Sequence, residues 1–222
     1  DVHPNNPTAV LDVLEAKIAD WTAAELKNRQ MIGVGIAMQG YRTGAADQFE
    51  TPTLLENWQN LELIPLFQDR FELPVFTENN ATSCATAEFY LGGAAEHSCF
   101  VYLSFNYGYG AGLYWQNKPV QGGHGNAGEI GSIYRPEDTI HRPALGELLK
   151  RMQMQGHAIA HISELPNYFS DDLPVISDWV QEVGPYLRQS LAALKGVMDP
   201  TAIFFGGEAP SGLRRALINE AN

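Results

Sequence analysis

The hydrophobic and polar positions along this chain follow two alternating spacings. Apolar residues at helical spacing predict helices over residues 10–26, 61–71, 81–91, 143–155, 173–197 and 213–218. Short apolar runs predict strands over residues 31–38, 73–76, 100–105, 113–115 and 201–205. The run Met31–Met38 carries no charged or strongly polar residue, so we expect a strand of the parallel type, buried on both faces. Strands and helices in alternation predict an α/β fold.

Turn and capping residues follow two of the predicted strands. Gly40 follows the first strand, at the carboxyl end where α/β folds usually bind ligands. Residues 43–60 are polar and are predicted to be irregular. Asn79 and Asn80 follow the second strand and precede a small-residue helix. Asn is among the best N-caps, so Asn80 is either a cap alone or a cap that also contacts a ligand.

Ser104–Ser132 contains eight glycines and is the most unusual stretch of the chain. Its first half predicts a strand, a turn over Gly108–Gly112, and a second strand. Its second half predicts an irregular loop that carries one carboxylate, Glu129. Glycine lets backbone N–H groups approach a ligand closely, so the stretch is interpreted as the floor of a pocket. The alternative is a hairpin followed by a loop with no ligand.

Composition narrows the class of protein. The chain has 222 residues and a formal net charge of −12, which argues against a broad nucleic-acid or anionic-membrane surface in this segment. Cys84 and Cys99 form neither a disulfide framework nor a metal quartet, so a reduced, cytoplasmic protein is expected. No apolar run approaches the roughly 18 residues that span a bilayer. The chain opens at Asp1, not at Met, so we expect a processed or excised piece of a longer protein.

The histidines and the basic residues of the predicted helix 143–155 do not indicate a metal site or another functional site. His157 and His161 are four residues apart and share a face if helical, but no acidic metal motif accompanies them. We therefore expect surface histidines and no metal site. Lys150 and Arg151 are interpreted as the solvated end of a helix.

The order of several motifs resembles the ROK family, which comprises bacterial sugar kinases and sugar-responsive transcriptional regulators. The motifs are Gly33–Gly40, Asn57–Asn60, Pro74–Asn80, Gly108–Gly112 with Gly122–Gly131, and Phe205–Gly207. The most specific is N-A-G-E-I-G at Asn126–Gly131. The resemblance implies an actin-like (RNase H-like) two-lobed α/β fold with mixed sheets flanked by helices. Residues 1–79 would be part of the N-terminal lobe, and residues 80–222 would be the C-terminal lobe with the glycine-rich sugar-site loops.

Site residues follow from this resemblance by position. The implied sugar-binding residues are Gly40, Asn60, Asn79, Asn80, Glu129 and Glu147, the last on a loose alignment. Amide and carboxylate groups suit this role because they donate to or accept from adjacent hydroxyls.

The chain departs from the family's kinases at the catalytic positions. Asn80 stands where the kinases have the Asp that acts as general base, and a neutral amide cannot take up a proton. Asn106 and Tyr107 replace the Gly-Thr of the phosphate loop, of which Gly108 and Gly110 remain as a remnant. The D-x-G-G-T loop is absent, so the N-terminal lobe is expected to be incomplete. Ser132 replaces a His, and residues 133–138 replace a Cys-rich zinc loop, so zinc is not expected.

The predicted function is a non-catalytic, sugar-sensing effector domain of a ROK-type transcriptional regulator. Its partners would be a sugar or sugar phosphate, a second copy in a homodimer, and DNA only through a helix-turn-helix domain outside this sequence. No catalytic residue and no cofactor are expected. The alternative is an ATP-dependent sugar kinase, which would need ATP and Mg²⁺. A scaffold with no small-molecule ligand is the third possibility.

Overall fold

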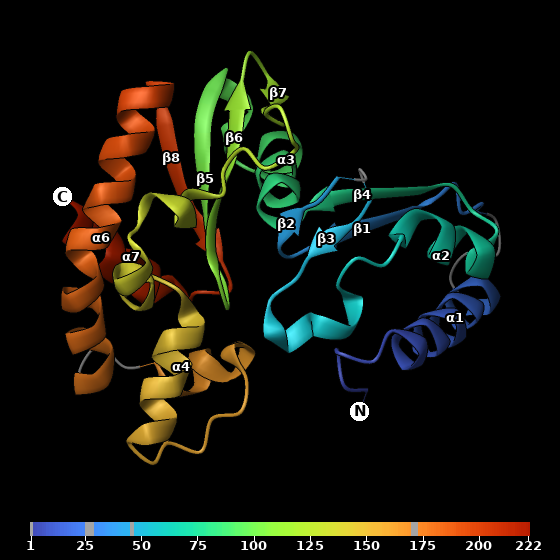
Figure 1. Cartoon of the computed structure of the whole chain (residues 1–222), viewed down its shortest axis with the longest axis horizontal. Coiled ribbons are helices and arrows are strands. Elements are labelled where there is room, and N and C mark those ends of the chain that lie inside the picture. Colours follow the sequence, from blue (N-terminus) through green and yellow to red (C-terminus); the bar gives the residue numbers. More distant parts are fainter. Residues whose placement is uncertain (1, 25–28, 45–46, 170–172) are drawn as a thin grey trace. The chain divides into compact units, whose positions relative to one another are not determined.

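The structure is a computed structural model that describes residues 2–24, 29–44, 47–169 and 173–222, and it divides into two compact units. Unit 1 runs to Asn80 and also contains Gln121–Asn126. Unit 2 contains Ala81–Val120 and Ala127–Asn222. The sequence interpretation grouped residues 121–126 with residues 80–222, whereas here they belong to unit 1. Each unit has its own buried apolar core. Figure 1 shows the helices and strands that make up each unit.

Unit 1 is built on two parallel strands, β1 (Val34–Met38) and β4 (Val75–Asn79). Helices α1 (Pro7–Ala24) and α2 (Leu63–Phe71) pack their apolar sides against one face of this pair. The core contains Leu11, Met38, Phe49, Trp58, Leu63, Phe67 and Val75. The register pairs Met38 with Asn79, so the carboxyl ends of both strands meet at one edge. The helix predicted over 10–26 is α1; residues 25 and 26 lie outside the described residues.

The prediction that Met31–Met38 is buried on both faces is wrong. Gly35 and Ala37 are exposed, and neighbouring Phe76 of β4 is 70% exposed. The strand alternates because α1 and α2 cover only one face of the β1–β4 pair. Among the described strands, only β4 pairs with β1.

Residues 43–60 are more regular than predicted. β2 (Tyr41–Arg42) pairs antiparallel with β3 (Phe49–Glu50), and the 3-10 helix η1 (Thr53–Trp58) follows. Gly40 precedes β2 with φ +115°, and a Cβ at this position would collide with the carbonyl oxygen of Glu50. The turn after β1 therefore requires glycine.

Unit 2 contains a mixed four-stranded sheet in the order β7-β6-β5-β8. The strands are β5 (Cys99–Phe105), β6 (Tyr109–Trp115), β7 (Lys118–Pro119) and β8 (Ala202–Gly207). β5 pairs antiparallel with β6 and parallel with β8. The predicted turn over Gly108–Gly112 is wrong, because β6 already begins at Tyr109. Gly112 lies within β6, where a Cβ would collide with the carbonyl oxygen of Ala81, so this glycine serves close packing.

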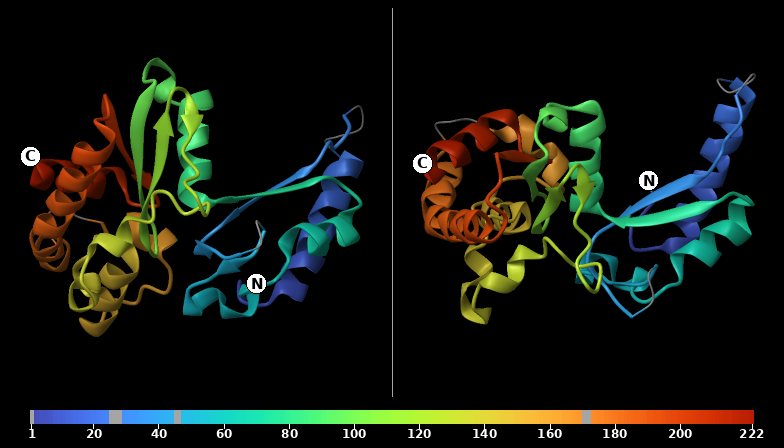
Figure 2. Two further views of the ribbon diagram at one scale, coloured as in Figure 1. Left: turned by 45° about the horizontal axis from the view of Figure 1, so that its top comes forward. Right: turned by 90° about the horizontal axis from the view of Figure 1, so that it is seen from above.

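Helices cover both faces of this sheet, as Figures 1 and 2 show. On one face, α3 (Asn80–Leu91) packs Ala85 and Phe89 against Phe100 and Tyr114. On the other, α6 (Pro174–Met198) and α7 (Ser211–Ala221) pack against alternate residues of β5. α6 continues through Pro185. The other elements of unit 2 are η2 (Ala94–Glu96), η3 (Ile130–Ile133), η4 (Pro136–His141), α4 (Leu145–Met154), η5 (Ile162–Glu164) and α5 (Leu165–Tyr168).

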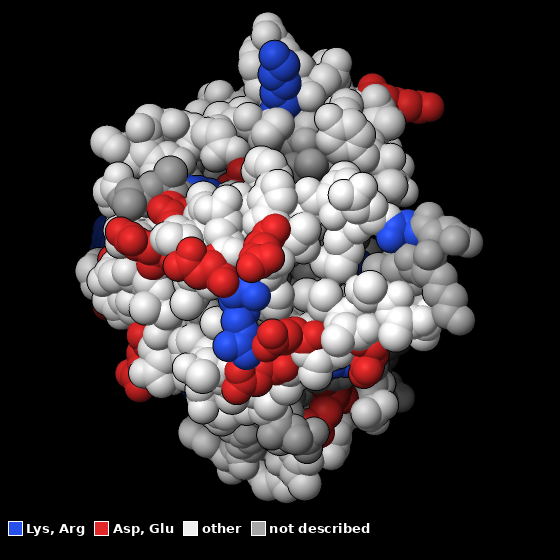
Figure 3. Space-filling model, turned by 90° about the vertical axis from the view of Figure 1, so that its right-hand side faces the viewer, with Lys and Arg blue, Asp and Glu red and all other residues white. Residues whose placement is uncertain are grey.

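The surface agrees with the acidic composition. On the face shown in Figure 3, Asp and Glu side chains flank a short row of Lys and Arg side chains. Arg70 of α2 donates to Asp12 of α1 at 2.6 Å, which links the two helices of unit 1. None of the helices in the described part of the chain is long and apolar enough to cross a membrane.

Candidate functional site

Gly40 and Asn79 lie together in unit 1, at the carboxyl ends of β1 and β4. The Asn79 side-chain amide donates to the carbonyl oxygen of Gly40 at 3.4 Å. The Asn79 backbone N–H donates to Glu78 Oε1 at 2.8 Å. Gly40 and Asn79, both predicted to bind a sugar, are 39 residues apart in the chain. The parallel pairing of β1 with β4 brings them to one edge of the sheet.

Asn60 and Asn80 occupy different positions in unit 1. Asn80 is the first residue of α3 and is partly buried, directly after β4. Asn60 is exposed, with φ 57°, and its backbone N–H donates to the carbonyl oxygen of Phe49 at 3.0 Å. Asn60 therefore shapes the turn before α2, and its predicted role in sugar binding stays a prediction.

Glu129 belongs to unit 2 and is positioned by the glycine before it. The carbonyl oxygen of Gly128 accepts from the N–H of Ala111 in β6 at 2.8 Å. Gly128 has φ +98°, and a Cβ there would collide with the Ala111 carbonyl oxygen. Glu129 then precedes η3, and its carbonyl oxygen accepts from the Ser132 hydroxyl at 2.8 Å. The loop thus fixes the backbone of Glu129 against β6.

Glu147 lies in the first turn of α4, in unit 2. Its Oε1 accepts from Lys150 Nζ at 2.9 Å, and its side chain is 25% exposed. A carboxylate paired with an exposed ammonium keeps acceptor capacity for other groups. The geometry is compatible with the predicted contact to a sugar hydroxyl and does not require it.

The phosphate-loop remnant forms the turn between β5 and β6. Asn106 is buried, and its side-chain amide donates to Ser104 Oγ at 2.9 Å. Its Oδ1 accepts from the N–H of Glu208, after β8, at 2.9 Å. Asn106 therefore fastens the ends of β5 and β8 to each other. The backbone N–H of Asn106 donates to the Gly108 carbonyl oxygen, whereas Gly110 lies in β6 opposite Ser104.

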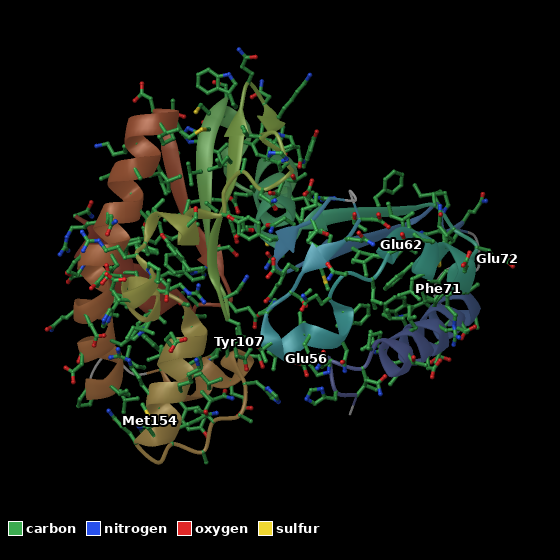
Figure 4. The ribbon with its side chains drawn as sticks, viewed as in Figure 1. Glu56, Glu62, Phe71, Glu72, Tyr107 and Met154 are labelled. Carbon is green, nitrogen blue, oxygen red and sulfur yellow. The ribbon has the colours of Figure 1, made fainter. Side chains whose placement is uncertain are left out.

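Tyr107 follows Asn106 and is labelled in Figure 4 at this turn. Its carbonyl oxygen accepts from the N–H of Gly146 in α4 at 3.2 Å. A Cβ on Gly146 would lie 3.1 Å from the Tyr107 ring, so the ring packs against the start of α4. Burial raises the pKa of the Tyr107 phenol, so the side chain stays neutral at physiological pH.

A polar network that the sequence patterns did not predict centres on Arg42 in unit 1. Asn126 Oδ1 accepts from the Arg42 N–H at 2.7 Å, and Asn126 Nδ2 donates to the Arg42 carbonyl oxygen at 2.8 Å. Arg42 also pairs with Glu78 at 3.2 Å, and Gln121 Nε2 donates to the other oxygen of Glu78 at 2.6 Å. The only sequence signal was the specific motif that contains Asn126. These residues line a cavity of about 780 Å³, together with Thr43, Gly44, Thr77, Gly123, His124 and Gly125.

Histidines hold no metal cluster in the described part of the chain. His141 instead bonds Glu182 Oε1 through Nδ1 at 2.7 Å and stacks on Tyr186. The interpretation of Arg151 as a solvated helix end is wrong, because Arg151 also donates to Glu182, through Nη1 at 2.7 Å. Hydrogen bonds from Arg151, followed by those from His141, lower the pKa of Glu182 to about 2.

The fold and these motifs define a class: an actin-like α/β protein with asparagine- and glycine-containing motifs at its strand ends. Comparison with known proteins agrees, since the model of the ROK family matches residues 2–211. The chain belongs to the ROK family.

Relatives of the chain include a repressor, a sugar kinase and a protein without a described function. A xylose repressor of Bacillus spizizenii is 31% identical over 90% of this chain and 54% of its own length. A beta-glucoside kinase of Listeria innocua is 27% identical over 86% of this chain and 71% of its own length. An uncharacterized protein, y4fQ of Sinorhizobium fredii, is 24% identical over 98% of this chain and 56% of its own length. The chain thus spans about half the length of y4fQ and of this xylose repressor.

Solved structures confirm the predicted fold. A ROK family glucokinase from Streptomyces griseus, in complex with glucose and AMPPNP, has a TM-score of 0.74 and 21% identity. The match covers 99% of this chain and 77% of that one. A ROK family transcriptional regulator, a homologue of the Escherichia coli MLC protein, has a TM-score of 0.66 and 22% identity, over 96% of this chain and 59% of that one. At these identities the likeness concerns the fold alone.

Proposed function

We propose that this chain is the sugar-binding part of a ROK-family transcriptional regulator and does not transfer phosphate. One observation carries the proposal: residue 80 is Asn where the family's kinases have the Asp that acts as general base. Asn80 starts α3 directly after β4, as the motif requires. A neutral amide there can bind a hydroxyl, but it cannot accept that hydroxyl's proton.

The turn between β5 and β6 supports the same proposal. The family's kinases have Gly-Thr at this turn, and these small residues would leave room for a phosphate. This chain has the larger Asn106 and Tyr107 instead. The Asn106 side chain is buried and uses both ends of its amide to hold β5 and β8. The Tyr107 ring packs against α4. Both side chains therefore have structural roles in place of a phosphate contact.

The proposed ligand is a neutral sugar or a sugar derivative. Asn79, Asn80 and Glu129 would bind its hydroxyl groups, with Gly40, Asn60 and Glu147 as further contacts. DNA would be bound by a helix-turn-helix domain outside this chain, and the regulator would act as a homodimer in the cytoplasm. No cofactor takes part in this function. The match to xylose repressors supports the regulator, and it makes xylose the first sugar to test.

A sugar kinase is the second candidate. It is favoured by the match to a beta-glucoside kinase over 86% of this chain and by that to a glucokinase of Streptomyces coelicolor over 92%. This candidate needs ATP, Mg²⁺ and a base other than Asn80. It also needs a phosphate site that tolerates Asn106 and Tyr107.

Ligand-dependent stability of the intact protein separates the two candidates. The melting temperature is measured with xylose, glucose, N-acetylglucosamine and their phosphates, with and without Mg-ATP. If the chain is part of a regulator, we expect one sugar to raise the melting temperature, because a ligand that binds only the folded state stabilises it. We also expect no release of ADP. Sugar-dependent release of ADP would contradict the proposal. Loss of the rise in Glu129→Gln, at an unchanged melting temperature without sugar, would assign the binding to the motif.

The variant Asn80→Asp tests the argument about the base. We expect it to remain inactive with Mg-ATP, because the turn at Asn106 and Tyr107 is unchanged. Appearance of ADP release in Asn80→Asp alone would show a kinase disabled at a single residue.

A further inference from the structure

The cavity around Arg42 in unit 1 is lined by none of the sugar-binding residues predicted in that unit. Its volume of about 780 Å³ lies within the range of small-molecule sites. None of Gly40, Asn60, Asn79 and Asn80 lines it. Glu78 does line it, and successive side chains of a strand point to opposite faces, so Glu78 and Asn79 serve different faces of β4.

The wall of this cavity is held in place by hydrogen bonds. Asn126 holds the backbone of Arg42 at both its N–H and its carbonyl group. Arg42 Nη2 donates to the Thr77 carbonyl oxygen at 3.3 Å and to Glu78 at 3.2 Å. The guanidinium carbon lies 4.9 Å from the centre of the Phe49 ring. Such a wall is preorganised, so a ligand would lose little free energy in ordering it.

Two neighbouring donors of this wall lack partners within the described residues. Arg42 Nε and Thr43 Oγ1 are buried and make no hydrogen bond. The Arg42 side chain as a whole is only 12% exposed. A buried donor without an acceptor is costly, and most such groups bind water or a ligand. Both would be satisfied by oxygen atoms of a molecule in the cavity.

The charges and polarity of the wall select the kind of molecule. Glu78 uses one oxygen for Arg42 and the Asn79 N–H, and the other for Gln121, so it does not present a free carboxylate to a cation. The same carboxylate neutralises Arg42 and would repel an oxyanion. Among the described residues that line the cavity there is no Leu, Ile, Val, Met, Phe, Tyr or Trp, so an apolar ligand finds no large apolar side chain there. A neutral molecule with several hydroxyl groups satisfies the donors without these costs.

We propose that this cavity is a second carbohydrate site, which binds a neutral sugar or polyol through Arg42 Nε and the Thr43 hydroxyl. The proposed contacts to the ligand do not include Asn79, Asn80 or Glu129. The second site therefore stands whether or not those residues bind a sugar.

The variant Thr43→Val tests the site in the intact protein. Valine has nearly the shape of threonine without the unpartnered hydroxyl. We expect the melting temperature without ligand to stay the same or rise, and binding at the cavity to weaken about 3- to 10-fold, the effect of one hydrogen bond. Thr8→Val is the matched control, because Thr8 is exposed in α1 and does not line the cavity. A lower melting temperature with unchanged binding would give Thr43 a structural role and overturn the proposal.

Calorimetric titration with xylose, glucose and sucrose separates this site from the motif residues. We expect Glu129→Gln to keep one class of sugar binding, which Thr43→Val then weakens in the double variant. Loss of all sugar binding in Glu129→Gln would overturn the second site and leave the proposed function intact. If Glu129→Gln leaves sugar binding unchanged and Thr43→Val weakens it, the result would support the cavity as the sugar site and contradict sugar binding by the motif residues. Inorganic phosphate serves as the oxyanion probe, and saturable phosphate binding that Thr43→Val weakens would overturn the assignment to a neutral ligand.

Discussion

Single residues in the glycine-rich loop have separate tasks. Gly128 allows the backbone to pass against Ala111, and the backbone of Glu129 follows at a fixed position next to β6. At Gly123, five residues earlier, an added Cβ would meet no atom within 4 Å, and the backbone has no positive φ. The sequence predicted that this loop needs glycine, but it could not tell which glycines are required. That distinction depends on contacts with β6, which lies before the loop in the chain.

Gly128→Ala and Gly123→Ala therefore form a matched pair. We expect Gly128→Ala to lower the free energy of unfolding by about 2 kcal/mol or more, because it combines a positive φ with a backbone clash. Gly123→Ala should change it by less than about 0.5 kcal/mol. Urea denaturation followed by fluorescence measures both. Equal stability of the two variants would show that the contact between Gly128 and Ala111 is not formed.

The sequence indicated the roles of some side chains and not of others. Gly40 and Asn79 were identified as candidates from the resemblance to the ROK motifs, and parallel pairing of β1 with β4 brings them together. Asn106 was recognised as a departure from a motif, but its role in joining β5 to β8 was not. Arg42 gave no signal, since its partners Glu78 and Asn126 are 36 and 84 residues away. Pairings over such distances are set by the fold and not by local pattern.

At the scale of elements, η4, α4 and α6 meet at Glu182. Arg151 of α4 and His141 of η4 both bond this carboxylate of α6. By the resemblance to the family, η4 lies where a zinc loop is expected. The cluster of His141, Arg151 and Glu182 takes part in holding η4 to α4 and α6. Helix positions were well predicted from apolar spacing, but an ion pair between helices leaves no trace in that spacing.

The cluster predicts a pH dependence of stability. Hydrogen bonds from Arg151 lower the pKa of Glu182 from 4.5 to about 2 in the folded protein. A depressed pKa adds stability above the unfolded value and loses it as pH falls through the folded value. Glu182→Gln should therefore cost about 1 kcal/mol at pH 7, since the carboxylate is partly exposed, and the cost should shrink between pH 4.5 and 2.

Denaturation curves of both proteins at several pH values measure this difference. Glu62→Gln is the control, because Glu62 is exposed in unit 1 and lies outside this cluster. A difference between wild type and Glu182→Gln that stays constant with pH would contradict the role of the Glu182 charge.

At the scale of the whole molecule, the two units differ in how their sheets are completed. β5 is flanked by β6 and β8, and Val101, Leu103 and Phe105 are fully buried. β1 is paired with β4 alone among the described strands. Val34 donates to the Pro74 carbonyl oxygen at 2.8 Å, so the alternate residues Gly35 and Ala37 direct their N–H groups to the other edge. The sequence predicted buried strands in both units because apolar content alone does not reveal how many neighbours a strand has.

Native-state hydrogen exchange should report this difference directly. We expect the slowest amides in β5, at Val101 and Leu103, because opening them requires disruption of the core of unit 2. In β1, Val34 should be protected while Gly35 and Ala37 exchange quickly. Slow exchange at Gly35 and Ala37 would show that another strand pairs with this edge in solution.

The pair of hydrogen bonds between Asn126 and Arg42 also affects how the chain can be divided. Because it holds residues 121–126 in unit 1, the polypeptide passes between the units three times, after residues 80, 120 and 126. No single cut can release either unit as one continuous fragment. A gene truncated at residue 80 would encode unit 1 without Gln121 and Asn126, and one that starts at residue 81 would carry those six residues without their partners. Gene fragments and limited proteolysis are therefore poor ways to isolate either unit, whereas replacing 121–126 by a short linker would sever unit 1 from this loop and leave unit 2 continuous.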